Sequence, residues 1–158
     1  MKTTACPTDA MEDSRSEASW HALPADATAS GLARTFAIEQ LSTWHLHGLA
    51  DDLRLVVSEL VSNAVTHGRP PVMMRIQHTP WSLALNTVRV EVIDTGRMPP
   101  AATTELLEAG PDDVLDAAHA VHPEREGGRG LFLIDQLATS WGITGCSSGT
   151  LVWCELTS

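Results

Sequence analysis

The sequence predicts an α+β fold, a two-layer α/β sandwich with helices on one face of a mixed, mainly antiparallel sheet. Two observations support this class. The first half of the chain contains two long segments with helical hydrophobic spacing, residues 27–47 and 51–68. The second half contains short strand-like segments bounded by glycine and proline, at residues 72–78, 88–94 and 141–156.

The composition indicates one intracellular domain. A chain of 158 residues with 43% hydrophobic residues can bury one sizeable core. Twenty acidic and ten basic residues give a net charge of -10, which argues against direct binding to nucleic acid or to an anionic membrane, because both require a basic surface. No apolar run approaches the roughly 20 residues that span a bilayer. Cys6, Cys146 and Cys154 have neither metal-ligand spacing nor a disulfide pattern. We therefore expect a cytoplasmic protein with reduced thiols.

The chain divides into a tail, a domain and a lid inside that domain. Residues 1–19 are rich in Ser, Thr, Asp and Glu without periodicity, and we expect a flexible tail there. Residues 20–158 form the domain. Within it, residues 97–126 lie between two glycine clusters and contain one expected short helix at 104–109. Because long loops in compact domains are often functional, we expect this segment to be a lid.

The first elements are an extended piece at residues 20–23 and the two helices. In the first helix, the large hydrophobic residues at helical spacing are Leu32, Phe36, Ile38, Leu41 and Trp44. The second helix begins near Asp51 and Asp52, since acidic residues suit a helix N-terminus, and it ends at Gly68. His67 lies on its apolar side, so we expect this residue in the core or at the edge of a cleft.

The strands follow the second helix. Pro70 and Pro71 end the helical pattern, and residues 72–78 suit a strand. After a turn at residues 80–81, valines alternate with charged residues up to Asp94. Residues 128–140 then predict a helix that is entered through glycines, and residues 141–143 and 150–156 predict a closing hairpin around residues 147–149.

The segment LVVSELVSNAVTHG, residues 55–68, places an acid and an amide in a hydrophobic helix. On a helix, Asn63 lies only about 40° round from Glu59. Both side chains border an apolar stripe, formed by Leu53, Val56, Val57, Leu60 and Ala64. A half-buried carboxylate is costly unless a cation or a proton-donating substrate binds it, which favours a cleft at this position. A partly exposed glutamate and a capping amide near Gly68 remain the simpler interpretation.

Two glycine clusters offer sites for a nucleotide. In GGRGLFLID, residues 127–135, three glycines precede the predicted helix, and backbone N–H groups at a helix N-terminus suit phosphate oxygens. Arg129 could pair with a terminal phosphate. In VEVIDTG, residues 90–96, a strand ends at Asp94, whose carboxylate could accept a hydrogen bond from the exocyclic amine of adenine. Ordinary turns explain each cluster equally well when it is taken alone.

The order of the three motifs resembles the Bergerat-fold (GHKL) ATPase superfamily, which includes the histidine kinases. VVSELVSNAVTHG matches the N box, VIDTG the first glycine box and GGRGLFLID the second. The short domain and the segment SELVSNAVTHG are most similar to the bacterial anti-sigma-factor serine/threonine kinases of the RsbW and SpoIIAB type. The resemblance covers about residues 20–157.

This resemblance implies ATP and Mg²⁺ as cofactors, with a role for each matching residue. Glu59 would act as the general base that takes the proton from a serine hydroxyl of an anti-sigma antagonist. Asn63 would coordinate the Mg²⁺ that bridges the phosphates. Asp94 would bind the adenine amino group, Gly96 would let the base lie close to the backbone, and Thr150 would lie near the adenine. The phosphates would be held by Gly128, Arg129, Gly130 and Leu131.

The implied partners are a sigma factor and an anti-sigma antagonist protein, and a homodimer remains open. The chain departs from the family at Met98, which stands at the second glycine of the first glycine box. Adenine contact survives this change, but the start of the lid is altered. Two alternatives therefore stay open: a non-catalytic ATP-dependent protein-binding module, and a stand-alone histidine-kinase-type catalytic domain. The sequence has no P-loop or Rossmann glycine motif.

Overall fold

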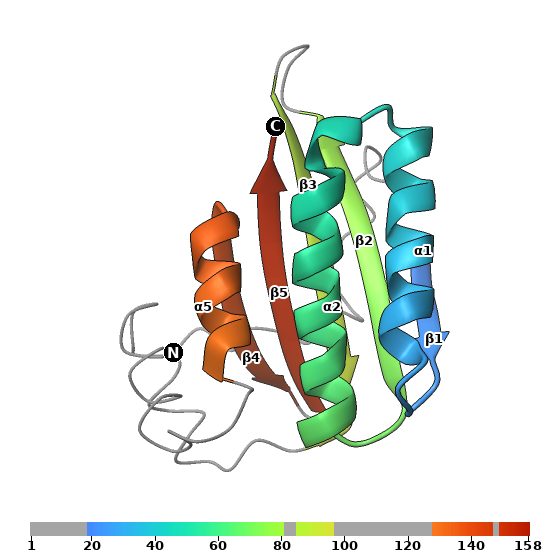
Figure 1. Cartoon of the computed structure of the whole chain (residues 1–158). Coiled ribbons are helices and arrows are strands. Elements are labelled where there is room, and N and C mark those ends of the chain that lie inside the picture. The colour runs from blue at the N-terminus through green and yellow to red at the C-terminus, as the bar shows by residue number, and fades with distance from the viewer. Residues whose placement is uncertain (1–18, 81–84, 97–127, 147–148) are drawn as a thin grey trace.

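The computed structural model of the chain describes residues 19–80, 85–96, 128–146 and 149–158. Residues 1–18 of the expected tail, the lid and the short helix at 104–109 lie outside these ranges, as does Met98. Ser19, the last residue of the expected tail, belongs to a strand. Within them, α-helices and a five-stranded sheet form two layers (Figure 1).

The sheet is built from two hairpin-like pairs of strands and one further strand at an edge. Its strands are β1 (Ser19–Leu23), β2 (Val72–Pro80), β3 (Asn86–Asp94), β4 (Ser140–Cys146) and β5 (Gly149–Thr157). They lie in the order β1-β2-β3-β5-β4, and every pairing among the described strands is antiparallel. The predicted α+β sandwich is confirmed, with an antiparallel rather than a mixed sheet in these residues.

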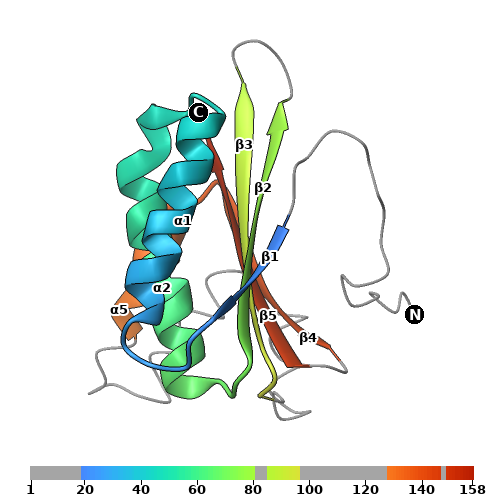
Figure 2. The same cartoon turned by 90° about the vertical axis from the view of Figure 1, so that its right-hand side faces the viewer.

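The helices lie side by side on one face of the sheet (Figure 2). They are α1 (Ala29–Thr43), the short 3₁₀ helix η2 (His47–Leu49), α2 (Ala50–His67) and α5 (Gly128–Leu137). The central helix, α2, packs against α1, α5 and strands β2, β3 and β5. Of the helices that the structure describes, none is long and apolar enough to cross a bilayer.

Helix α1 packs mainly through a stripe of small residues, while Leu41 is the one fully buried member of the large set that the sequence pattern suggested and Phe36, Ile38 and Trp44 are partly buried against the core. Its buried residues are Ala29, Ala33, Ala37 and Leu41, whereas Leu32 is 54% exposed. Because alanines four residues apart form one stripe, α1 can lie close against its neighbours. The helix also ends at Thr43, before the predicted residue 47, and His45 takes a positive φ of 59°.

Helix α2 follows its prediction closely. All five residues of the predicted apolar stripe are buried, and Glu59 and Asn63 lie half-buried at its border. Asp51 and Asp52 lie in the first turn. Gly68 caps the C-terminus with extended backbone (φ -84°, ψ -165°), so this glycine does not serve the left-handed cap that is common there.

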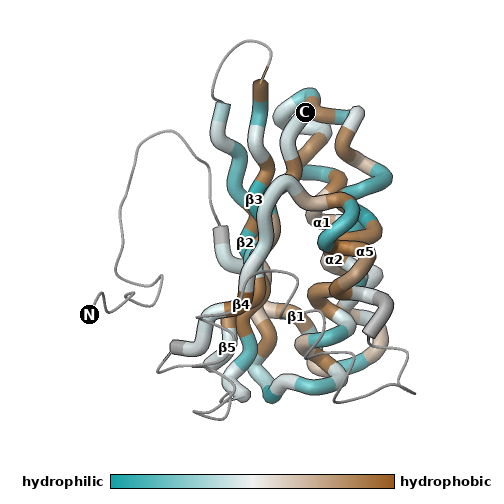
Figure 3. The backbone as a smooth tube through the Cα atoms, turned by 90° about the vertical axis from the view of Figure 1, so that its left-hand side faces the viewer, coloured by the Kyte–Doolittle hydropathy of each residue, from teal (hydrophilic) through white to brown (hydrophobic). Residues whose placement is uncertain are grey.

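The core lies between the helices and the inner face of the sheet. In β3, Val88, Val90 and Val92 are fully buried against the helices, together with Met74 and Ile76 of β2. Figure 3 shows the corresponding alternation of hydrophobic and hydrophilic residues along the strands and helices. This packing fixes the register of α2 over the ends of β3 and β5, where the site residues lie.

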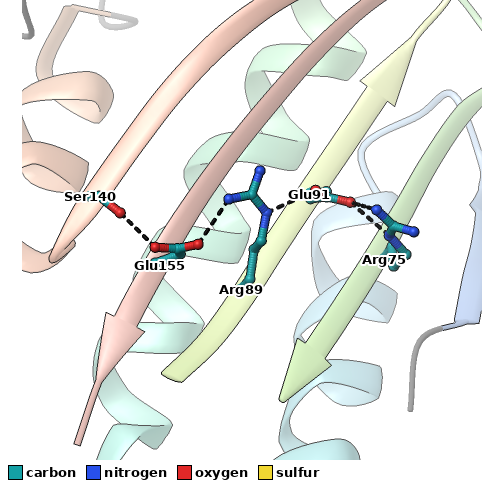
Figure 4. A network of polar contacts seen from close by, with 5 residues as sticks. All are labelled: Arg75, Arg89, Glu91, Ser140 and Glu155. Carbon is teal, nitrogen blue, oxygen red and sulfur yellow. Dashed lines mark hydrogen bonds and ion pairs between the residues drawn. The ribbon is translucent and has the colours of Figure 1, made fainter. Parts of the chain in front are cut away.

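The charged residues of β3 form a polar network on the opposite face of the sheet (Figure 4). Glu91, which is only 3% exposed, pairs with Arg75 through one oxygen and with Arg89 Nε at 2.8 Å through the other. Arg89 also binds Glu155 at 2.9 Å, and the Ser140 hydroxyl donates to Glu155 at 2.7 Å. Since both oxygens of Glu91 have a cationic partner, this buried charge is compensated within the sheet.

Candidate functional site

A cavity of about 700 Å³ lies between the C-terminal end of α2, the end of β3 and the start of β5. Four predicted site residues line it: Asn63, Asp94, Gly96 and Thr150. They come from three elements that are distant in sequence. The volume falls within the range of about 300–1,000 Å³ that is typical of small-molecule sites.

Asp94 is the buried acid of this cavity, with 7% of its surface exposed. Its Oδ1 accepts hydrogen bonds from the backbone N–H groups of Gly96 (2.6 Å) and Arg69 (3.3 Å). No donor from the described residues bonds Oδ2. The two backbone bonds therefore orient the carboxylate and leave its second oxygen to accept a hydrogen bond from a ligand.

Three glycines make room for Asp94. A Cβ atom at Gly68 would lie 2.5 Å from Cγ of Asp94, and one at Gly96 would lie 2.7 Å from Oδ1. Gly149 has a positive φ of 152°, and a Cβ atom there would collide with the carbonyl oxygen of Asp94. The close approach to Asp94 thus explains the glycine at the end of α2 and the glycine at the start of β5.

Two threonines close the same end of the cavity. Thr150 lies opposite Asp94 in the β3–β5 register, and its hydroxyl donates to the carbonyl oxygen of Gly96 at 2.8 Å. Thr95 donates its N–H to the carbonyl of Arg69 at 2.9 Å and its hydroxyl to the carbonyl of Pro70 at 2.7 Å. These bonds tie the end of β3 to β5 on one side and to the segment after α2 on the other.

Glu59 lies against the first turn of α5. The sequence pattern suggested a glycine loop before this helix, but the helix already begins at Gly128 and includes Arg129 and Gly130. A Cβ atom at Gly130 would overlap Oε2 of Glu59 and would lie 3.2 Å from its Cδ. The carboxylate therefore sits beside a helix N-terminus, where unpaired N–H groups carry partial positive charge.

Some predicted phosphate-binding residues do not reach the cavity described above. Leu131 is partly buried, packs against the core and does not line the cavity. The side chain of Arg129 lies outside the described part of the structure. Glu59 and Gly130 do not line the cavity, but Asn63, one turn along α2 from Glu59, does.

The cavity also includes two basic side chains that were not assigned to the site from the sequence. His67, which was expected in the core or at a cleft edge, is exposed and lines the cavity, so the cleft-edge alternative is correct. Arg69 also lines it. The sequence signal for both was their position at the end of the N-box helix, where the chain turns towards the sheet.

The residues present fit a magnesium nucleotide. Asp94 supplies an acceptor at one end of the cavity, and Asn63 supplies an amide oxygen further along α2. Among the described residues, no three His, Cys, Asp or Glu side chains cluster as a metal site. Mg²⁺ does not need such a cluster when it arrives with ATP, because it keeps several waters and binds one or two protein oxygens together with the phosphates.

Comparison with known proteins places these features in a family. A family model described as a histidine kinase-like ATPase domain matches residues 23–155. This range includes α1, α2, all of the cavity residues and the first turn of α5. A search of curated proteins found no match to the chain.

Proposed function

Because the chain belongs to the histidine kinase-like ATPase family, we propose that it is an anti-sigma-factor serine/threonine kinase. In this proposal it binds ATP with Mg²⁺, phosphorylates a serine of an anti-sigma antagonist and controls a sigma factor by partner switching. Membership of the family establishes the ATP-binding regulatory class. The acceptor and the protein partners are the proposed part.

The observation that carries the proposal is the spacing of polar groups along α2. Gly68 at the end of this helix contacts Asp94, Asn63 lines the cavity, and Glu59 lies beside α5. Glu59 precedes Gly68 by nine residues, which is about 13 Å along a helix. A nucleoside triphosphate has a comparable length. This spacing supports a base bound at Asp94 and a terminal phosphate near Glu59.

The chemistry follows from this placement. Bound ATP with Mg²⁺ supplies the phosphoryl group that is transferred. Oδ2 of Asp94 accepts a hydrogen bond from the exocyclic amine of the base, and the amide oxygen of Asn63 is available as a magnesium ligand. The first turn of α5, beside Glu59, supplies unpaired backbone N–H groups that suit phosphate oxygens. Glu59 would accept the proton of the serine hydroxyl while the serine oxygen forms its bond to the terminal phosphorus. The bond from this phosphorus to the β–γ bridging oxygen would break, and ADP would leave.

Labelled ATP tests the proposal. The protein is incubated with Mg²⁺ and candidate antagonists, and we expect label on serine. Glu59→Gln keeps the size of the side chain but removes the base, so transfer should fall by 100-fold or more, roughly the contribution of a general base, while ATP binding persists. Glu39→Gln, at an exposed position of α1, is the matched control and should transfer normally.

Other outcomes identify the alternatives. Label on histidine would indicate a histidine-kinase-type catalytic domain. ATP binding without transfer to any acceptor would indicate a non-catalytic binding module. Full transfer by Glu59→Gln would remove Glu59 from the mechanism and leave the kinase assignment in place.

A further inference from the structure

Arg69 follows Gly68, the C-cap residue of α2, and lines the cavity. Its backbone is held on two sides. Its N–H donates to Oδ1 of Asp94, and its carbonyl accepts from the N–H of Thr95 (2.9 Å) and from the hydroxyl of Thr95 (3.2 Å). The Cα atom of Arg69 is therefore fixed next to the carboxylate that is expected to bind the base.

The guanidinium group of Arg69 has no hydrogen bond or ion pair to another residue that the structure describes. Among the arginine side chains that the structure describes, the other four hydrogen bond to Ser58 or form ion pairs with acidic residues: Arg34, Arg54, Arg75 and Arg89. Arg69 has no such bond within the described residues and is exposed. In a chain with twenty acidic and ten basic residues, a cation at a cavity that has no acidic partner among the described residues is available to a ligand.

Arg69 lies nearer to the position expected for the base than to the position expected for the phosphates. Asp94 contacts the edge of a bound purine, which leaves the faces of the ring to be covered by other groups. A guanidinium group is planar and weakly hydrated, and it stacks well on aromatic rings and on nucleic acid bases. Glu59 precedes Arg69 by ten residues, so the expected phosphate position beside Glu59 is about 15 Å away along the axis of α2.

We infer that Arg69 is a further nucleotide-binding residue, whose guanidinium group stacks on the purine ring held by Asp94. This inference rests on the proposed ATP binding and adds a contact that determines affinity for the base. Because Arg69 bonds Asp94 and Thr95 only through its backbone, a change of its side chain leaves those bonds in place.

Competition binding tests the contact. Adenosine, ADP and ATP each displace a fluorescent ADP analogue from the wild type, Arg69→Ala, Arg69→Gln and Arg54→Ala. We expect Arg69→Ala to lose roughly 3- to 30-fold in affinity, equally for all three ligands, as the strength of cation–π stacking implies. Arg69→Gln, which keeps a planar group without the charge, should lose less. Arg54→Ala removes the same charge from an exposed position at the other end of α2 and should bind as the wild type does.

Two results would overturn the inference and leave the proposed function in place. Unchanged affinities in Arg69→Ala would show that the side chain does not contact the nucleotide. A loss confined to ADP and ATP, and abolished at high salt, would place the guanidinium group on the phosphates instead. Failure of the wild type to bind any of the ligands, the analogue included, is a different result, which overturns the proposed function together with this inference.

Discussion

Substitution of Gly130 by alanine tests the role of Glu59 without changing Glu59 itself. The added Cβ atom would occupy the place of Oε2 of Glu59, and it would lie 3.2 Å from Cδ and 3.6 Å from Cβ of the same residue. The last distance is an ordinary van der Waals contact. Helices α2 and α5 therefore need not separate, and the carboxylate group must rotate away from α5.

The structure gives the expected size of the effects on stability and on phosphoryl transfer. Turning the half-buried glutamate out of its rotamer costs about 0.5–1.5 kcal/mol, whereas alanine in place of glycine in a helix gains up to about 1 kcal/mol. The free energy of unfolding should thus change by less than about 1 kcal/mol. Displacement of a catalytic group by about 1 Å lowers the rate by about 100-fold, so phosphoryl transfer should fall while the fold persists.

The assay combines single-turnover phosphoryl transfer with thermal unfolding. Gly31→Ala is a matched control, because a Cβ atom at this position in α1 meets no atom nearer than 3.8 Å. It should keep the wild-type transfer rate and unfold at the same or a higher temperature. A Gly130→Ala protein that is folded and transfers at the full rate would refute the reasoning, because the position of the Glu59 carboxylate would then not matter.

Three further predictions follow from individual contacts. Asp94→Asn replaces the acceptor Oδ2 by a donor, so ATP affinity should fall about 10- to 100-fold, and GTP should compete better than it does with the wild type. Equal losses of affinity for ATP and GTP in competition binding would contradict the assigned contact. Glu91→Gln removes the anion between two partly exposed arginines, and urea unfolding should show a loss of about 2 kcal/mol with unchanged nucleotide affinity. Burial raises the pKa of the Cys154 thiol from 9.0 to about 12. Since the unfolded thiol ionises first, stability should fall by about 1.4 kcal/mol between pH 8 and pH 10, and Cys154→Ala should lack this part of the pH dependence.

The sequence predicted α2 well because several independent signals agree there. The apolar stripe, the acidic first turn and the terminal Gly68 define the same helix. In α1 the signals conflict. Large hydrophobic residues suggested a stripe that included Leu32, yet the buried stripe consists mainly of alanines. Alanine carries little hydrophobic signal, and close helix packing, which favours it, depends on neighbours that a single sequence does not reveal.

The site was predictable where a motif specifies it and unpredictable where it depends on register. Asn63, Asp94 and Gly96 lie in motifs that indicated one cleft, and they do line one cavity. The contribution of Gly149 could not be foreseen, because it depends on β5 beginning directly beside the last residue of β3. The same holds for Arg69, whose backbone contact with Asp94 joins segments 25 residues apart.

The arrangement separates the binding of the base from the chemistry at the phosphate. Asp94 is held by the end of α2, β3 and the start of β5, whereas Glu59 contacts α5. Rotation of the Glu59 carboxylate away from α5, which Gly130→Ala requires, leaves the surroundings of Asp94 intact. Gly130→Ala should therefore lower transfer with normal nucleotide affinity, and Asp94→Asn should lower affinity with a normal transfer rate at saturating ATP. If both variants lost nucleotide affinity and transfer rate together, the two ends of the site would be coupled. That result would contradict the separation of base binding from phosphoryl transfer.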